Sequence, residues 1–391
     1  MNDAGSADRV ILCVVGTRPE VVKMAPLVLR LRRAAGLRVR LVSTGQHREL
    51  LDRALDDFGL VADRDLGLMQ PGQSLAEITA RALTALDAAF ASERPDLVLA
   101  QGDTTTVLAS ALASFYRQVP FGHVEAGLRT GQPYRPFPEE KNRVLAGHLA
   151  RHHFAPTAGA RLNLLREGID PAAVHVTGNT GIDALRLAAD RPVALPVTPA
   201  TGRMLLVTAH RRENFGEPLA AIARALRDLV ERDPGLSVVF PIHPNPAVRP
   251  AVEAQLRDLP RVHLIEPVSY LGFVGLMRAS FAILTDSGGV QEEGPSLGKP
   301  VLVLRDETER PEAIAAGTAR LVGTRREAIV EAVEALTRDP AHDRRSATIV
   351  NPYGDGWAAE RIVRVLLNHF GLPDPPDPPG FDPTWPDRAD R

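Results

Sequence analysis

The sequence is poor in the residues that cross-link a protein or anchor it in a membrane. Among its 391 residues Cys13 is the single cysteine, which excludes disulfides within the chain and cysteine-based zinc sites. A run of about 18 uninterrupted apolar residues is missing, so we expect no membrane span. The first ten residues have no basic region followed by an apolar stretch. We therefore expect no secretion signal and predict a cytoplasmic protein.

An excess of charge of either sign is also lacking. The formal net charge is −2, which gives no broad attraction to nucleic acid or to an anionic membrane surface. Apolar residues make up 44% of the chain and charged residues 24%, a composition typical of globular proteins. The length is sufficient for two ordinary domains, each with its own core.

Several motifs for cofactors and metals are absent. The segment "GTRPEVVK", residues 16–23, has one glycine where a dinucleotide-binding turn has three, so NAD binding is not expected. The segment "GPSLGKP", residues 294–300, is one residue shorter than a phosphate-binding loop, and Pro300 replaces the hydroxyl that would hold magnesium. Neither an HExxH zinc motif nor an Asp-rich calcium loop occurs. We expect no cofactor and no catalytic metal.

Short apolar strands alternate with amphipathic helices along most of the chain. Such continuous apolar strands are typical of a parallel sheet covered on both faces. The Pro-rich residues 191–202 indicate a linker. The predicted fold class is therefore α/β, with two doubly wound Rossmann-like domains, residues 8–190 and 203–350, facing across a cleft. A helix in residues 351–370 is expected to pack back on the first domain, and the Pro- and Asp-rich residues 371–391 are predicted to be disordered.

Polar residues collect just after the predicted strands, where open parallel sheets bind their ligands. They are basic, acidic, amide, hydroxyl or imidazole side chains: Arg18, Gln46, Asp103, Glu125 and Glu139 in the first domain, and His210, His243, Ser287, Glu309 and Arg310 in the second. Three carboxylates at neighbouring strand ends would raise one another's pKa, which suits proton transfer. We therefore expect a catalytic site at these strand ends.

Each of these residues also has a structural interpretation. Asp103 is able to cap the following helix. Glu139 is able to favour the helix dipole or to pair with Arg143. Glu125 ends a strand, where an unpaired carboxylate is costly to bury, and a structural ion pair with Arg129 is the main alternative to a catalytic role. For His210 and His243 the alternative is an ordinary loop histidine whose ring is hydrogen-bonded.

The segment "TDSGGVQEEG", residues 285–294, combines a glycine turn with two carboxylates. A strand turns there into a helix whose N-terminal N–H groups are able to bind a diphosphate. Ser287, Gly288 and Gly289 allow close approach of that backbone. Glu292 and Glu293 follow at once, however, and their negative charge should repel a phosphate, so the segment alone leaves its ligand open.

Ten segments in this order resemble motifs of one enzyme family. They are "GTRPEVVKMAPLV", "QHRELLD", "MQPGQSLAEIT", "QGDTTTVLA", "GHVEAGLRTG", "PEEKNR", "TGNTGIDAL", "AHRRENFG", "LTDSGGVQEEGPSLGKPVLVLRDETERPEA" and "NPYGDGWAAERI", and they cover roughly residues 10–370. The chain resembles the non-hydrolysing UDP-N-acetylglucosamine 2-epimerases, bacterial enzymes with a glycosyltransferase-B-like fold. Such enzymes interconvert UDP-GlcNAc and UDP-ManNAc, without NAD or a metal, through 2-acetamidoglucal and UDP held in a closed cleft.

The resemblance implies roles for individual residues. It assigns the catalytic carboxylates to Asp103, Glu125 and Glu139, and the histidine that meets the diphosphate to His210. It assigns UDP contacts to Arg18, Lys23, Phe273, Ser287, Gly288, Gly289, Glu293 and Arg310. Some members are activated by a second UDP-GlcNAc, and the corresponding region here contains Gln46, Glu49, Gln70, Arg211 and His243.

The resemblance also implies a homodimer that supplies ManNAc-type sugars for cell-surface polysaccharide. The alternatives are a hydrolysing epimerase that releases ManNAc and UDP, an epimerase of a modified UDP-HexNAc, a UDP-sugar transferase of the same architecture, and a catalytically silent UDP-sugar sensor. A transferase would not need three carboxylates in the first domain. A sensor would not need to keep every expected acid and the histidine.

Overall fold

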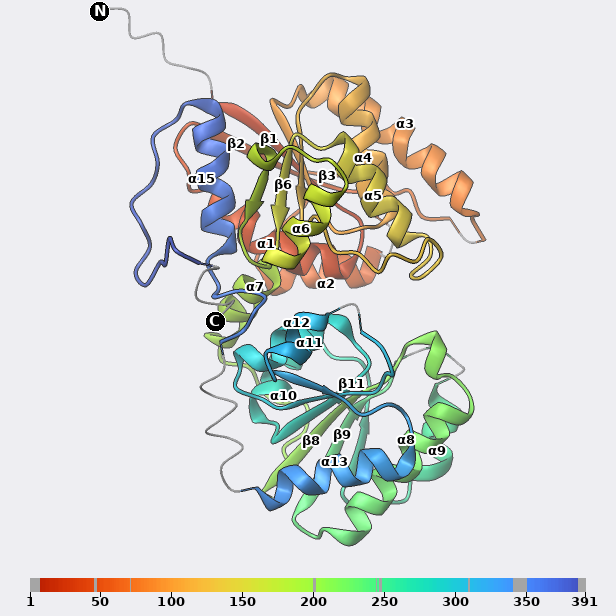
Figure 1. Cartoon of the computed structure of the whole chain (residues 1–391). Helices are drawn as coiled ribbons and strands as arrows, with labels where there is room; N and C mark the ends of the chain where they lie inside the picture. Colours follow the sequence, from red (N-terminus) through yellow and green to blue (C-terminus); the bar gives the residue numbers. More distant parts are fainter. Residues whose placement is uncertain are drawn as a thin grey trace, which may run out of the picture. The chain divides into compact units, whose positions relative to one another are not determined.

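The chain forms two compact units (Figure 1). The computed structural model describes residues 8–45, 48–70, 72–199, 202–243, 245, 248–308, 310–339 and 350–385, except for the side chains of residues 48–50 and 212. Unit 1 comprises Met1–Leu187 and Tyr353–Arg391, and unit 2 comprises Ala188–Pro352. The chain therefore leaves unit 1 after Leu187 and re-enters it at Tyr353.

Unit 1 contains a seven-stranded parallel sheet with the strand order β3-β2-β1-β4-β5-β6-β7. Its strands are β1 (Arg9–Val15), β2 (Leu37–Ser43), β3 (Arg64–Asp65), β4 (Leu97–Gln101), β5 (Phe121–Val124), β6 (His152–Ala155) and β7 (Val174–Val176). The connecting helices are α1 (Arg18–Leu31), α2 (Arg48–Asp57), α3 (Leu75–Glu93), α4 (Thr105–Tyr116), α5 (Glu139–Leu149), α6 (Ala158–Arg166) and α7 (Thr180–Ala189), with a short helix η1 at Pro171–Ala173. The C-terminal helix α15 (Ala358–Phe370) also belongs to unit 1.

Unit 2 contains a six-stranded parallel sheet with the order β10-β9-β8-β11-β12-β13. Its strands are β8 (Arg203–Thr208), β9 (Leu236–Pro241), β10 (Val262–Ile265), β11 (Ala282–Thr285), β12 (Val301–Val303) and β13 (Ala319–Leu321). Its helices are α8 (Glu217–Arg232), α9 (Arg249–Leu256), α10 (Tyr270–Ala279), α11 (Gly288–Ser296), α12 (Pro311–Ala315) and α13 (Arg326–Arg338), with η2 at Arg212–Asn214. Within the described parts of both units, every helix is too short or too polar to cross a membrane.

The central strands are buried along their whole length because helices cover both faces of each sheet. Every residue of β4, β5, β6 and β11 is buried. In unit 1 apolar residues of β1 and β4 pack with α3 and α4, and in unit 2 those of β8 and β9 pack with α8 and α13. The uninterrupted apolar strands thus lie, as predicted, in parallel sheets that helices cover on both faces.

Each sheet has a point where the strand order reverses. In unit 1 the central strand β1 lies between β2 and β4, with Ile11 opposite Val39 on one side and Leu97 on the other. In unit 2 the central strand β8 lies between β9 and β11 in the same way. Open α/β sheets bind ligands beyond the carboxyl ends of the strands at such a point. A ligand site is therefore expected at the turns after β1 and β4 in unit 1 and after β8 and β11 in unit 2.

Helix α15 packs against α1 of unit 1 (Figure 1). Asp183 of α7 accepts hydrogen bonds from the first two N–H groups of α15, at 3.2 Å from Ala358 and 2.8 Å from Ala359. Beyond the helix, the guanidinium of Arg361 lies 4.8 Å from the ring centroid of Trp385, and Trp385 is buried. Trp385 thus offers the guanidinium of Arg361 a stacking surface, while the disorder expected for the tail stays a prediction. Residues 386–391 lie outside the described part of the chain.

Candidate active site

The carboxylate of Glu125 receives hydrogen bonds from three side chains. Glu125 directly follows β5, and its backbone is in the left-handed region, with φ of 62°. Asn179 donates to Oε2 at 2.7 Å, Gln101 donates to Oε1 at 3.0 Å, and the Lys23 ammonium forms an ion pair with Oε2. A non-glycine residue keeps this backbone conformation only where its surroundings hold it. The contacts therefore fix the carboxylate at the end of β5 and stabilise its negative charge.

The predicted ion pair between Glu125 and Arg129 is not formed. Arg129 instead donates to both carboxylate oxygens of Glu167, at 2.7 and 2.8 Å. Burial opposes the charged form of Glu167, but the hydrogen bonds and charge of Arg129 outweigh it and lower the pKa of that carboxyl. Arg129 is therefore not the ion-pair partner of Glu125, whose cationic partner is Lys23 instead.

Asp103 follows β4 and forms an ion pair with Arg143 of α5. The N-cap of α4 is Thr104, whose hydroxyl accepts from the Val107 N–H, so the predicted capping role of Asp103 is wrong. Asn142 holds the Asp103 backbone by donating to its carbonyl at 3.0 Å. The Asp103 side chain remains 31% exposed, so its carboxylate is accessible to a ligand.

Glu139, the third predicted acid, is the first residue of α5 and is half-buried. Its side chain makes neither a hydrogen bond nor an ion pair with the described residues. Arg143 pairs with Glu140 at 3.4 Å instead of Glu139, so that predicted alternative is also wrong. Glu140 accepts from the N–H groups of Thr130 and Gly131, at 3.0 to 3.2 Å, and so fixes the loop before α5.

A buried acid that the sequence prediction missed connects two of the turns. Glu20 of α1 accepts from the N–H groups of Gly16 and Thr17, at 2.7 and 2.6 Å, and from the Thr104 hydroxyl at 2.6 Å. Burial raises the pKa of Glu20, and these hydrogen bonds oppose that effect. The side chain thus joins the turn before Arg18 to the residue after Asp103. Thr17 and Glu20 form a capping box, a pattern that is readable in the sequence.

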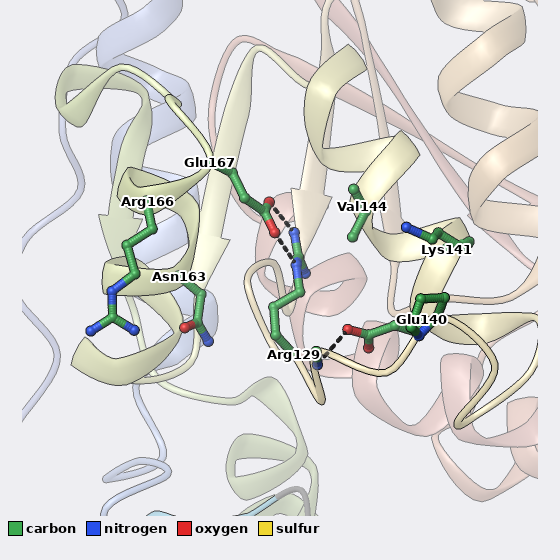
Figure 2. A pocket seen from close by; sticks show the side chains of 9 residues that line it. Arg129, Glu140, Lys141, Val144, Asn163, Arg166 and Glu167 are labelled. Atoms are coloured by element: carbon green, nitrogen blue, oxygen red, sulfur yellow. Dashed lines mark hydrogen bonds and ion pairs between the residues drawn. The ribbon is translucent and has the colours of Figure 1, made fainter.

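A cavity of about 340 Å³ lies between the loop before α5 and helices α5 and α6 (Figure 2). Its lining is mostly charged or amide-bearing and comprises Arg129, Gly131, Pro133, Glu140, Lys141, Val144, Asn163, Arg166 and Glu167. Figure 2 shows the Arg129–Glu167 pair in its centre. None of the three predicted catalytic acids lines it. Asp103 is joined to the cavity lining through Arg143, which forms ion pairs with both Asp103 and the lining residue Glu140.

In unit 2, His210 lies against a buried carboxylate. Asp286 follows β11 and is fully buried, and its Oδ2 accepts from the N–H groups of His210 and Arg211 at 2.9 and 2.8 Å and from the Asn214 amide at 2.9 Å. Its Oδ1 lies 3.4 Å from His210 Nδ1. Burial lowers the pKa of His210, and Asp286 opposes this, whereas Arg211 and His243 add to the lowering. Asp286 thus holds the turn after β8 through its Oδ2 and places a negative charge beside the imidazole.

The turn into α11 holds a buried arginine. Arg310 donates through Nε to Glu292 at 2.7 Å, and both side chains are buried. A Cβ on Gly288 would lie 2.5 Å from the Arg310 guanidinium carbon. A side chain at position 288 would therefore displace this guanidinium, which lies against the N-terminus of α11, an end whose backbone N–H groups are able to bind an anion. Glu293, one turn along, accepts from the Tyr270 hydroxyl at 3.2 Å.

The remaining predicted residues have varied surroundings. Arg18 begins α1, Phe273 is half-buried in α10, Ser287 is the N-cap of α11, and Gly289 has open space at the position of a Cβ. In the region proposed for a second nucleotide, Arg211 is half-buried beside His210, the ring of His243 stacks on that of His210 at 5.6 Å, and Gln70 is exposed. Gln46, Glu309 and the side chain of Glu49 lie outside the described residues.

The comparisons with known proteins agree on one family. The profile described as UDP-N-acetylglucosamine 2-epimerase matches residues 29–367. The chain belongs to this family. It is 50% identical over 370 residues to the UDP-N-acetylglucosamine 2-epimerase of Escherichia coli (strain K12), covering 92% of this chain and 98% of the relative. It is also 50% identical over 363 residues to that of Bacillus subtilis (strain 168), covering 92% and 96%.

A solved structure of the UDP-GlcNAc 2-epimerase from Neisseria meningitidis bound to UDP-GlcNAc is 47% identical and matches with a TM-score of 0.86, covering 92% of this chain and all of that one. The predicted family and the α/β fold are therefore confirmed.

In this epimerase-family chain the residues that the sequence prediction missed are mostly partners of predicted ones. Gln101 and Asn179 hold Glu125, Arg143 holds Asp103, and Asp286 holds His210. Asn179 and Asp286 lie inside segments that carried the resemblance, "TGNTGIDAL" and "LTDSGG", so a signal for them was present. Their individual contacts depend on tertiary structure and are not readable from spacing.

Proposed function

We propose that the chain interconverts UDP-N-acetylglucosamine and UDP-N-acetylmannosamine by inverting C2 of the sugar. The observation that carries the proposal is the pair of acids Asp103 and Glu125 at the ends of the adjacent strands β4 and β5, each held by a cationic side chain. Two carboxyl groups at neighbouring strand ends suit a reaction that removes a proton from one face of a carbon and returns one to the other.

The proposed reaction begins with removal of the C2 proton by one carboxylate. The electrons of the C–H bond form the C1–C2 double bond, and the C1–O bond breaks, so that UDP departs with its electron pair and 2-acetamidoglucal remains. A second carboxylic acid then delivers a proton to the opposite face of C2 while a UDP oxygen re-forms the bond to C1. Asp103, Glu125 and Glu139 are the residues proposed for these transfers.

The departing diphosphate requires cationic and N–H donors. Unit 2 supplies them in one region: the N-terminus of α11 after Ser287, the Arg310 guanidinium beside Gly288, and the His210 imidazole. Arg18 and Lys23 are proposed as further UDP contacts from unit 1. Phe273 is proposed to lie beside the uracil, and Glu293 to accept from the ribose hydroxyls.

Substitution of the acids tests the proposal. We expect Asp103→Asn or Glu125→Gln to abolish C2 epimerisation of UDP-GlcNAc while the circular dichroism spectrum stays that of the unaltered protein. Each variant keeps side-chain size and removes one proton-transferring group, which typically lowers a rate by about 10²- to 10⁴-fold. The exposed Glu231→Gln on α8 serves as a control with full turnover. Near-normal turnover of either site variant would contradict the assignment.

Product analysis separates the proposal from its closest alternative. A non-hydrolysing epimerase yields intact UDP-ManNAc, whereas a hydrolysing enzyme releases ManNAc and UDP. The same measurement with other UDP-HexNAc substrates defines which sugar decoration is accepted. We also propose, from the family resemblance, a homodimer in the cytoplasm that needs no NAD or metal, and a second UDP-GlcNAc site that includes Arg211 and His243.

A further inference from the structure

The sequence motif "NPYGDGW", residues 351–357, has no part in the proposed chemistry, yet it contains the place where the chain re-enters unit 1. Asn351 still belongs to unit 2, where its amide donates to the Glu292 carbonyl and the Ser296 hydroxyl of α11, both at 2.6 Å. Tyr353 belongs to unit 1 and is fully buried there. Asn351 and Tyr353 thus lie on either side of the point where the chain re-enters unit 1.

Tyr353 and Gly354 pack directly on the turn that carries Asn179. The Asn179 N–H donates to the Tyr353 carbonyl at 2.7 Å. Gly354 has φ of 154°, and a Cβ at that position would lie 3.3 Å from Ile182 Cγ1 and 3.5 Å from the Asn179 nitrogen. A side chain at Gly354 would therefore crowd Ile182, three residues after Asn179, and would strain a backbone whose φ favours glycine.

Asn179 also contacts the catalytic acid. Its side chain is buried, its Oδ1 accepts from the Gly181 N–H at 2.9 Å, and its Nδ2 donates to Glu125 Oε2 at 2.7 Å. The Oδ1 contact fixes the amide orientation, so that Nδ2 faces the carboxylate. Because Glu125 has a left-handed backbone that only its surroundings maintain, the position of its carboxylate depends on such contacts.

We propose that Asn179 is a positioning residue. It orients the Glu125 carboxylate, and it takes its own position from the segment through which the chain re-enters unit 1. This inference rests on the proposed function, in which Glu125 transfers a proton at C2. It assigns a role to two motifs, "TGNTGIDAL" and "NPYGDGW", whose residues do not themselves react.

The test compares the epimerisation kinetics of full-length variants with UDP-GlcNAc. Loss of a hydrogen bond to a charged group in Asn179→Ala is expected to lower kcat by about 10- to 100-fold and to leave KM within about 2-fold. The limb of the pH–rate profile that belongs to Glu125 moves to higher pH, because the charged carboxylate has lost a donor. Asn179→Asp, which places a second carboxylate there, shifts the limb further in the same direction.

Two other variants separate positioning from a merely structural role. Gly354→Ala, which touches no carboxylate, is expected to shift the same limb in the same direction by a smaller amount. Val363→Ala removes buried apolar atoms from α15 and is expected to lower Tm without moving the limb. If Asn179→Ala lowers Tm like Val363→Ala and leaves kcat and the limb unchanged, or if Gly354→Ala leaves the limb in place, the inference is overturned. Absence of epimerisation by the unaltered protein would instead overturn the proposed function.

Discussion

Replacement of the buried Asp286 tests the arrangement around His210. Oδ2 of Asp286 accepts three hydrogen bonds, from the His210 and Arg211 N–H groups and from the Asn214 amide, at 2.8 to 2.9 Å. In Asp286→Asn an amide oxygen still accepts them, but the charge is lost, and each bond weakens from about 1.5–3 to about 0.5–1.5 kcal/mol. The three bonds share one oxygen and are not additive, so we expect a loss of about 2–3 kcal/mol of unfolding free energy. Asp286→Ala leaves three donors without that acceptor and is expected to cost about 4–6 kcal/mol.

The assay has to report on unit 2. Trp357 and Trp385 are the two tryptophans of the chain, and both belong to unit 1, so tryptophan fluorescence does not serve. Hydrogen exchange of peptides from β8 and α8 measures the unfolding free energy of unit 2 directly. The exposed Asp258→Asn is the matched control and is expected to lie within about 0.5 kcal/mol of the unaltered protein. Exchange in Asp286→Asn equal to that of this control would refute the reasoning.

The same variant has a second signature at His210. Burial already lowers the pKa of His210, and the Asp286 carboxylate opposes that effect. Without the carboxylate charge the pKa of His210 is expected to fall further, because the protonated imidazole loses its nearest anion. Histidine C2–H resonances followed against pH, with His210→Gln to assign the signal, measure this change. An unchanged or higher pKa in Asp286→Asn would contradict the arrangement.

Two further predictions concern packing and pH. In the same exchange assay, Gly288→Ala is expected to destabilise unit 2 by about 1–3 kcal/mol, because its methyl group collides with the Arg310 guanidinium. Gly289→Ala is the matched control. Its methyl group has open space, so unit 2 is expected to keep its stability or to gain up to about 1 kcal/mol. Burial lowers the pKa of His152 to about 4 from 6.5, so between pH 6.5 and 4 the unfolded chain binds a proton that the folded chain does not, and stability falls as the pH falls through this range. Between pH 7 and 5, His152→Asn is therefore expected to lose about 2 kcal/mol less unfolding free energy than the unaltered protein. Tryptophan fluorescence, which reports on unit 1, measures the unfolding. The exposed His148→Asn is the control and is expected to keep the pH dependence of the unaltered protein.

The positions of the site residues could be predicted from the sequence because they depend on local rules. An apolar strand ends where polar residues begin, and parallel strands place those ends on one edge of a sheet. This rule located Asp103, Glu125 and His210 at the carboxyl ends of β4, β5 and β8. The glycine pair and the glutamates after β11 likewise indicated a helix N-terminus, which the structure has at Gly288.

The partners of those residues could not be predicted in the same way. The donors to Glu125 come from positions 24, 54 and 102 residues away in the sequence, and no spacing rule connects them. The helix dipole and an i to i+4 pair were both reasonable for Glu139, yet Arg143 pairs with Asp103 and Glu140 because the fold brings these acids to it. Composition likewise gave no sign that Trp385 stacks on Arg361, since the two residues are 24 positions apart and only the fold brings them together.

The central claim is that C2 of the sugar is deprotonated and reprotonated by side chains of this chain. Its most direct test is NMR of the purified protein with UDP-GlcNAc in heavy water, without added NAD or metal. The account predicts UDP-ManNAc that carries deuterium at C2, because the proton returned to the sugar comes from an acid that exchanges with solvent. UDP-ManNAc formed without deuterium at C2 would contradict the account, because the hydrogen would then have returned internally.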